Sequence, residues 1–129
     1  MSRAYCQHVH ITCTDMAGMV AFWERGFAAV VEEYRTFSGV DGAILDIGMS
    51  AKLYLKKVPC EHIPDGPRRS GLEHLGMIVE DLDASLKNLA LLPDTTVLCQ
   101  PFLSPPVRCA YVQGPEGVMV EVMEYLPPL

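Results

Sequence analysis

The sequence has no excess of basic residues, no paired-cysteine motif and no long apolar run, and each absence removes a class of protein. Its 129 residues include 10 basic and 16 acidic ones, which gives a formal net charge of −6. That charge argues against a general nucleic-acid or anionic-membrane surface. The five cysteines form no Cys-x-x-Cys pair, and neither a signal peptide nor a membrane span is visible. We therefore expect reduced thiols in a cytoplasmic protein.

Two further observations bound the size and nature of the core. Hydrophobic residues make up 50% of the chain, which is ample for a packed interior. A chain of this length fits one compact domain or two very small units that share a core. Cys13 is expected to be a core residue. Cys6, His8 and His10 alternate, a spacing that is not typical of structural zinc.

The chain uses the same frame twice. The segments HVHITCTD (8–15) and HLGMIVED (74–81) both run from a histidine to an aspartate, at an offset of 66 residues. Residues 43–55 match 110–122 at an offset of 67, so that Tyr54 aligns with Glu121. The segment 57–71 between the copies is rich in proline and glycine and reads as a linker. Two copies are too few for a solenoid, so we expect a pseudo-symmetric pair.

A helix is predicted after each frame. Asp15 and Asp81 are potential N-caps, and apolar residues follow each of them at helical spacing. The predicted order is therefore strand, helix and several strands, done twice, in one domain spanning 1–129. Module one covers about 5–57, the linker 58–70 and module two about 71–126.

Strand parity sorts the side chains by face. His8, His10 and Thr12 share one face of the first strand, while Val9, Ile11 and Cys13 share the apolar one. His74 and Gly76 oppose Leu75 and Met77 in the second copy. Near the chain end, Glu121 lies within an apolar strand, where an unpaired charge is costly unless it is paired or bound to a metal.

Taken together, these features resemble the vicinal oxygen chelate superfamily, which includes glyoxalase I, methylmalonyl-CoA epimerase, extradiol dioxygenases, fosfomycin-resistance transferases and bleomycin-resistance proteins. The resemblance rests on the two His-to-Asp frames, the FWERGF element (22–27) and GPEGVMVEVMEY (114–125). It covers about residues 5–126. It implies an α+β fold in which two tandem βαβββ modules form an open, curled mixed-sheet barrel with helices outside.

The resemblance also implies a metal site. His8, His74 and Glu121 fall on three ligand positions of the family, while Tyr54 stands where glyoxalase I carries a fourth ligand. Two histidines and one carboxylate form a facial triad that leaves coordination positions open. The cofactor implied is one divalent metal ion, namely Fe, Mn, Ni, Co or Zn, which acts as a Lewis acid on vicinal substrate oxygens.

Four side chains are further candidates for the catalytic or substrate-binding site, and each also has a second interpretation. His10 is a candidate proton carrier or a pocket-lining residue. Tyr54 is a candidate donor to a substrate oxygen, a weak fourth ligand or a packing residue. Tyr111 is a candidate donor to a substrate oxygen or a packing residue. Lys52 shares the face of Tyr54, so its charge needs a partner. That partner is Glu121 or an anionic substrate, unless the side chain reaches water by snorkelling.

The function predicted from the resemblance is a metal-dependent isomerase or lyase, similar to glyoxalase or the epimerase, that acts on a small oxygenated, possibly anionic, metabolite. One alternative is an extradiol-type Fe(II) dioxygenase. Another is a metal-free protein that sequesters a small molecule, as in bleomycin resistance. A homodimer is expected because small members of the family commonly dimerise, and a clean monomer in light scattering would contradict this.

Overall fold

The computed structural model describes residues 7–37, 39–48, 51–57, 72 and 74–128. The chain divides into two compact units, Met1–Gly66 and Pro67–Leu129. The boundary falls within the predicted linker 58–70, which lies outside the described residues.

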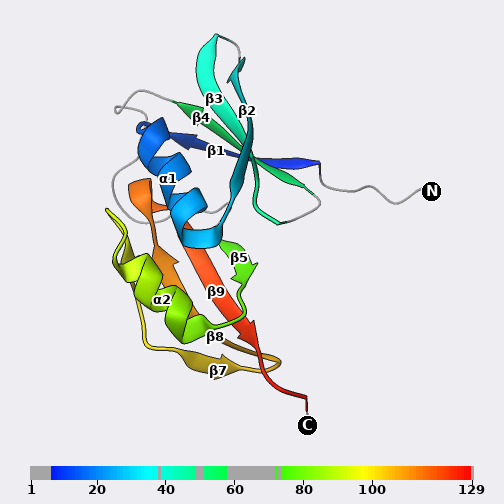
Figure 1. Cartoon of the computed structure of the whole chain (residues 1–129), viewed down its shortest axis with the longest axis vertical. Coiled ribbons are helices and arrows are strands. Elements are labelled where there is room, and N and C mark those ends of the chain that lie inside the picture. Colours follow the sequence, from blue (N-terminus) through cyan, green and yellow to red (C-terminus); the bar gives the residue numbers. More distant parts are fainter. Residues whose placement is uncertain (1–6, 38, 49–50, 58–71, 73, 129) are drawn as a thin grey trace, which may run out of the picture. The chain divides into compact units, whose positions relative to one another are not determined.

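The first unit is one helix on a four-stranded mixed sheet. Along the chain its elements are β1 (His8–Cys13), α1 (Met16–Phe27), β2 (Val30–Phe37), β3 (Val40–Asp46) and β4 (Lys52–Lys57). The strand order is β1-β4-β3-β2, in which β1 runs parallel to β4 and the other pairs are antiparallel. Figure 1 shows α1 in blue beside this sheet, and it packs against β2 and β4.

The second unit repeats the plan. Its elements are β5 (Leu75–Ile78), α2 (Leu82–Ala90), β6 (Thr96–Val97), β7 (Phe102–Ser104), β8 (Val107–Gln113) and β9 (Met119–Tyr125). The strand order is β5-β9-β8-β6, with β7 also paired to β8. Figure 1 shows β5, β9, β8 and β7 of this sheet. The parallel pair is again formed by the first and last strands of the unit, and α2 packs against β6, β8 and β9.

The strand registers confirm the duplication residue by residue. His10 pairs with Tyr54 in the first unit, and Gly76 pairs with Glu121 in the second. These positions differ by the same 66 and 67 residues that relate the two sequence segments. The predicted order of one strand, one helix and several strands in each half is confirmed.

The two units differ at one edge of the sheet. Where the first unit has the single long strand β2, the second has β6 and β7, two short strands that both pair with β8. Residues 98–101 separate them and end in Pro101, which has no backbone N–H to donate to a ladder. This interruption explains why the second unit has one strand more than the repeat predicts.

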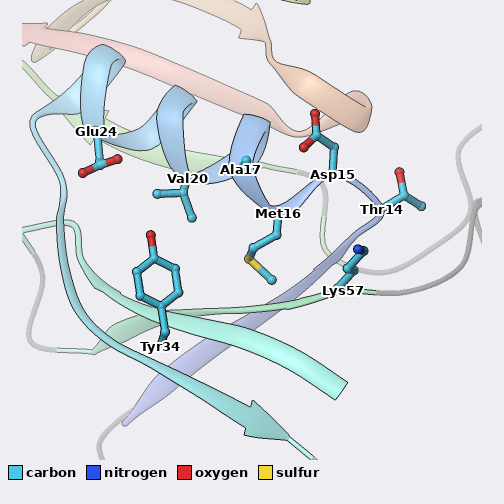
Figure 2. A pocket seen from close by; sticks show the side chains of 8 residues that line it. All are labelled: Thr14, Asp15, Met16, Ala17, Val20, Glu24, Tyr34 and Lys57. Carbon is cyan, nitrogen blue, oxygen red and sulfur yellow. The ribbon is translucent and has the colours of Figure 1, made fainter. Parts of the chain in front are cut away.

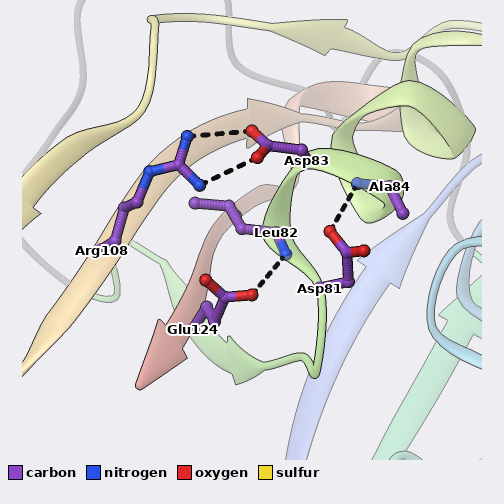
Figure 3. Close-up of polar contacts among 6 residues, drawn as sticks. All are labelled: Asp81, Leu82, Asp83, Ala84, Arg108 and Glu124. Atoms are coloured by element: carbon purple, nitrogen blue, oxygen red, sulfur yellow. Dashed lines mark hydrogen bonds and ion pairs between the residues drawn. The ribbon is translucent and has the colours of Figure 1, made fainter. Parts of the chain in front are cut away.

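Both predicted helix caps are present. The Asp15 carboxylate accepts a hydrogen bond from the backbone N–H of Gly18 at 2.9 Å, and Asp81 does the same for Ala84 at 3.0 Å. The start of α2 has a second acceptor, because Glu124 of β9 accepts from the backbone N–H of Leu82 at 3.2 Å (Figure 3). These acceptors satisfy amides that the helix itself leaves without partners.

An ion pair also connects α2 to β8. Arg108 binds the carboxylate of Asp83 through two nitrogens, at 3.2 and 2.9 Å (Figure 3). The Arg108 guanidinium holds the pKa of Asp83 below its usual range. The pair is exposed enough that solvent screens it, so its main effect is to fix orientation.

Apolar side chains fill the space between each helix and its sheet, and the predicted parity is confirmed. In β4, Leu53 and Leu55 are fully buried while the residues between them are only partly covered. In β9, Val120 and Val122 are fully buried. Cys13 is buried as expected, and Trp23 of α1 is fully buried beside Phe22 and Phe27.

The predicted α+β class with two tandem modules is confirmed. The described strands form two mixed sheets that are not closed into a barrel. Among the described residues, no helix is both long and apolar enough to span a membrane.

Candidate metal site

In the first unit, the side chains opposite the buried face form an aromatic cluster. The rings of His8 and Tyr54 stack with centroids 4.0 Å apart and planes inclined by 10°. His10 meets Tyr54 edge-on at 5.6 Å and Phe37 at 4.8 Å. The parallel register of β1 and β4 causes this contact, because it places His10 directly beside Tyr54. The structure therefore brings together three residues that the sequence predicted.

Gln7, the residue before β1, connects two members of this cluster. Its side-chain oxygen forms a hydrogen bond with Nδ1 of His8. Its side-chain nitrogen donates to the hydroxyl of Tyr54 at 3.4 Å. A histidine that ligates a metal usually bonds through its other ring nitrogen to an oxygen acceptor, and Gln7 provides such an acceptor for His8.

His10 is held in its neutral form more readily than an ordinary histidine. Partial burial lowers its pKa most, and electrostatic interactions with His8 and with the charge of Lys56 lower it further. Much of the side chain is nevertheless exposed. A neutral imidazole has a lone pair that can accept a proton.

Lys52 has carboxylate partners within its own unit. Its ammonium nitrogen lies 2.7 Å from a carboxylate oxygen of Glu32 and 3.9 Å from one of Asp46. These contacts raise the pKa of Lys52, the hydrogen bond to Glu32 most of all. Glu32 and Asp46 were not predicted as partners from the sequence. With them, Lys52 does not need an anionic substrate to balance its charge.

In the second unit, the structure brings together the other three predicted residues. Nε2 of His74 lies 3.6 Å from a carboxylate oxygen of Glu121, and both side chains are largely covered. Tyr111 pairs with Glu121 in the ladder, and its ring meets that of His74 edge-on at 5.4 Å. The ring of Phe102 of β7 also stacks with that of Tyr111, with centroids 6.3 Å apart.

The spacing of His74 and Glu121 fits two ligands of one metal ion. Two donor atoms that are each about 2.1 Å from an ion lie roughly 3.0 to 3.4 Å apart, depending on whether the geometry is octahedral or tetrahedral. The observed 3.6 Å is only slightly longer. Imidazole and carboxylate donors suit borderline and hard divalent ions alike.

The third predicted ligand, His8, belongs to the other unit. Within the part of the chain that the structure describes, no group of three or more histidine, cysteine or acidic side chains is arranged to hold a metal ion. In the second unit, the positions of His74 and Glu121 fit two ligands of one metal ion. That His8 completes the triad stays a prediction.

Cys109 adds a contact that the sequence analysis did not anticipate. It lies on β8, two residues before Tyr111, and is fully buried. Burial raises the pKa of its thiol, and the charge of Glu121 and a hydrogen bond with that carboxylate raise it further. The neutral thiol is thus a neighbour of a predicted metal ligand.

A groove of about 470 Å³ lies elsewhere in the first unit, beside α1 (Figure 2). The side chain of Tyr34 points from β2 toward Val20 and Glu24 of the helix. Tyr34 pairs with Ala43, which is on the buried, helix-covered face of the sheet. The groove therefore contains none of the predicted site residues, and those of the first strand, His8 and His10, lie on the opposite face of this sheet.

The contacting residues that were missed from the sequence include Gln7, Phe37 and Cys109, besides Phe102 and the partners of Lys52. Parity offered a signal for Cys109, because it is two residues from Tyr111. Phe37 is the last residue of β2, and no local pattern shows that it reaches β1 and β4. Gln7 lies outside the strand, so its contacts depend on side-chain rotamers that periodicity does not report.

Comparison with family models and with curated proteins found no match. Solved structures do match. A glyoxalase family protein from Bacillus cereus is 16% identical with a TM-score of 0.82, covering 98% of this chain and 97% of that one. A glyoxylase/bleomycin resistance protein/dioxygenase domain from Frankia sp. EAN1pec is 15% identical with a TM-score of 0.76, covering 97% and 100%.

A third similar structure is a mutant of the fosfomycin resistance protein FosX from Listeria monocytogenes, in complex with Mn(II) and 1S,2S-dihydroxypropylphosphonic acid. It is 13% identical with a TM-score of 0.71, covering 94% of this chain and 90% of that one. At such identities the likeness establishes the fold alone. This chain has the fold of the vicinal oxygen chelate superfamily, as its sequence resemblance predicted.

Proposed function

We propose that this protein is an enzyme that uses one divalent metal ion, held by His8, His74 and Glu121, to act on a small oxygenated metabolite. The observation that carries the proposal is the pair of His74 and Glu121, whose donor atoms lie 3.6 Å apart. Glu121 is on the face of β9 opposite the buried Val120 and Val122. The Mn(II) found in the similar FosX structure supports a metal in this fold.

The residues of this chain then have distinct tasks. When bound, the metal supplies Lewis-acid stabilisation of negative charge that develops on a substrate oxygen. Tyr54 and Tyr111 are the candidate donors to a substrate oxygen, one from each unit. His10 is the candidate proton acceptor, because its ring lies beside Tyr54 and His8. Lys52 is a candidate contact for an anionic substituent only if the substrate displaces its carboxylate partners.

We favour isomerase or lyase chemistry, in which a proton moves between substrate carbon and a side chain. Two histidines and one carboxylate leave room for a substrate with two adjacent oxygens. A residue near the substrate must then accept the proton within about 3 Å, directly or through one water. His10 meets the requirement of a neutral acceptor better than any other predicted site residue.

A second candidate is a dioxygenase reaction with Fe(II). The aromatic cluster favours it, because His10, Phe37 and Tyr54 offer ring surfaces to a planar substrate. The triad of two histidines and one carboxylate is also the set that non-haem Fe(II) oxygenases use.

Two assays separate these reactions. The protein is purified without chelators under anaerobic conditions and loaded with Mn(II), Ni(II), Co(II), Zn(II) or Fe(II). Small α-hydroxy ketones and 2-oxo acids are incubated in D₂O, and catechols are incubated with oxygen in an electrode cell. Isomerase or lyase chemistry predicts deuterium at a substrate C–H without oxygen uptake, and loss of that exchange in Glu121→Gln.

Oxygen uptake that requires Fe(II) and a catechol would favour the second candidate instead. A protein that binds ligands equally well before and after chelation, and that shows neither activity, would be a metal-free binding protein, contrary to the proposal. Tyr34→Phe, in the separate groove, serves as a control that leaves both reactions unchanged.

A further inference from the structure

We infer that Gln7 is a positioning residue that sets the ring tautomer of His8 and the hydroxyl direction of Tyr54. The inference deepens the proposed function, since it names a residue that prepares a ligand and a substrate donor of the same site. The two contacts of Gln7 that carry the inference both lie within the first unit.

The first step concerns the proton on His8. Nδ1 of His8 is hydrogen-bonded to the side-chain oxygen of Gln7. An amide oxygen can only accept a hydrogen bond, so Nδ1 must be the donor. In a neutral imidazole with its proton on Nδ1, the lone pair lies on Nε2. Metal ions bind the nitrogen that has the lone pair, so Gln7 selects Nε2 as the ligand atom.

The second step concerns the hydroxyl of Tyr54. The nitrogen of the same amide lies 3.4 Å from this hydroxyl oxygen. An amide nitrogen can only donate, so the tyrosine oxygen accepts here. The hydroxyl hydrogen must then point away from Gln7. This leaves Tyr54 able to donate to another acceptor, as a donor to a substrate oxygen must.

The third step is that the two ends of the amide depend on each other. Reversing the amide would make Nδ1 of His8 an acceptor, place the proton on Nε2 and turn the hydroxyl of Tyr54 toward Gln7. The stacked rings of His8 and Tyr54, 4.0 Å apart, hold both partners where one amide reaches them. One orientation of Gln7 therefore prepares both residues at once.

The test uses two variants with side chains of similar length. Gln7→Met has neither a donor nor an oxygen acceptor. Gln7→Glu keeps the acceptor for His8 but cannot donate to Tyr54. The tautomer of His8 is read from ¹⁵N ring shifts in the metal-free protein at about pH 8, where histidine is neutral. The resonance is assigned with His8→Gln. Mn(II) affinity is measured separately by competition with a chelating dye.

We expect the Nδ1–H tautomer in the wild type and in Gln7→Glu, and a shift toward Nε2–H in Gln7→Met. Mn(II) should bind the Glu variant as tightly as the wild type or more tightly. It should bind the Met variant about 10- to 100-fold more weakly, the usual cost of losing such a partner.

An Nε2–H tautomer in the wild type, or an unchanged tautomer in Gln7→Met, would overturn the inference. Unchanged Mn(II) affinity in Gln7→Met would overturn it as well. If the wild type binds no Mn(II) but Gln7→Met still shifts the tautomer, the proposed function fails while the control of His8 by Gln7 stands.

Discussion

At the residue scale, the charge environment of His10 gives the most direct pH prediction. Desolvation, His8 and Lys56 all lower its pKa. The folded protein therefore takes up this proton less readily than the unfolded chain. Above the unfolded pKa of about 6.5, His10 is neutral in both states and the free energy of unfolding has its full value. As the pH falls below about 6.5, the unfolded chain binds this proton more readily, so the free energy of unfolding decreases.

Removing the charge of Lys56 should raise the pKa of His10 toward its ordinary value. We expect this in Lys56→Gln, measured by NMR titration of the His10 ring in the metal-free protein. Lys57→Gln is the matched control, because Lys57 lies on the opposite side of β4 and lines the groove beside α1. Equal shifts in both variants would show that the local charge of Lys56 is not the cause.

The close packing of neighbouring atoms around Gly42 gives a second prediction at this scale. A Cβ added to Gly42 would lie 2.2 Å from the ring of Phe37 and 2.8 Å from the backbone oxygen of Leu55. Neither neighbour can yield easily, so Gly42→Ala should cost about 1–3 kcal/mol of unfolding free energy. It should also displace Phe37 from His10.

Gly76 is the matched control for Gly42. A Cβ there would meet only the terminal methyl of Met123, at 2.8 Å, and this flexible group can rotate away. We expect Gly76→Ala to change the unfolding free energy by no more than about 0.5 kcal/mol in chemical denaturation. A Gly42→Ala variant as stable as Gly76→Ala would show that Phe37 does not pack against β3 as described.

At the scale of elements, the end of α1 uses a residue that is not ideal for its conformation. Ala28 adopts the left-handed helical conformation, with φ of 55°, and its backbone N–H donates a hydrogen bond to the carbonyl of Glu24. Glycine adopts this conformation without a Cβ clash. Ala28 is exposed, so Ala28→Gly should stabilise the protein by about 0.5–1 kcal/mol.

The control for this substitution lies within the same helix. Ala21→Gly should destabilise by about 1 kcal/mol, because glycine loses more backbone entropy in a helix interior. Thermal and urea unfolding of both variants would give the two signs. If Ala28→Gly were as destabilising as Ala21→Gly, the left-handed end of α1 would be contradicted.

The start of α2 gives the second prediction about an element. Asp81→Ala removes one acceptor from the first turn and should cost about 1 kcal/mol. Asp81→Asn keeps a side-chain oxygen for the N–H of Ala84 and should cost much less. Urea unfolding that shows equal losses for both variants would mean that charge, not the hydrogen bond, accounts for the effect.

The elements also show how much of the fold the sequence contains. Aspartates followed by apolar residues at helical spacing predicted both helices, because caps and periodicity are local. Alternation predicted the buried faces of β4 and β9 for the same reason. The split into β6 and β7 was not predicted, because the repeat was aligned only over 43–55 and 110–122. The partners of Lys52 were missed because they depend on contacts between strands.

At the scale of the whole molecule, the duplication places different residue types at equivalent positions of the two units. Tyr54 and Glu121 occupy equivalent positions, and so do His10 and Gly76. The first unit therefore has an aromatic cluster where the second has a carboxylate beside His74. The ligand set of His8, His74 and Glu121 was predicted from the resemblance to a family, because residue spacing alone does not group them.

The central claim is that one metal ion is bound by His8, His74 and Glu121. The most direct test is the metal content of protein purified anaerobically, without chelator or metal-binding tag, by inductively coupled plasma mass spectrometry. We predict about one divalent ion per chain in the wild type, and its loss in His8→Ala and in His74→Ala. The control is His62→Ala, which should retain the ion, because His62 belongs to the predicted linker 58–70 and was not predicted as a ligand. No metal in the wild type after reconstitution, or retention of the ion in either ligand variant, would contradict the account.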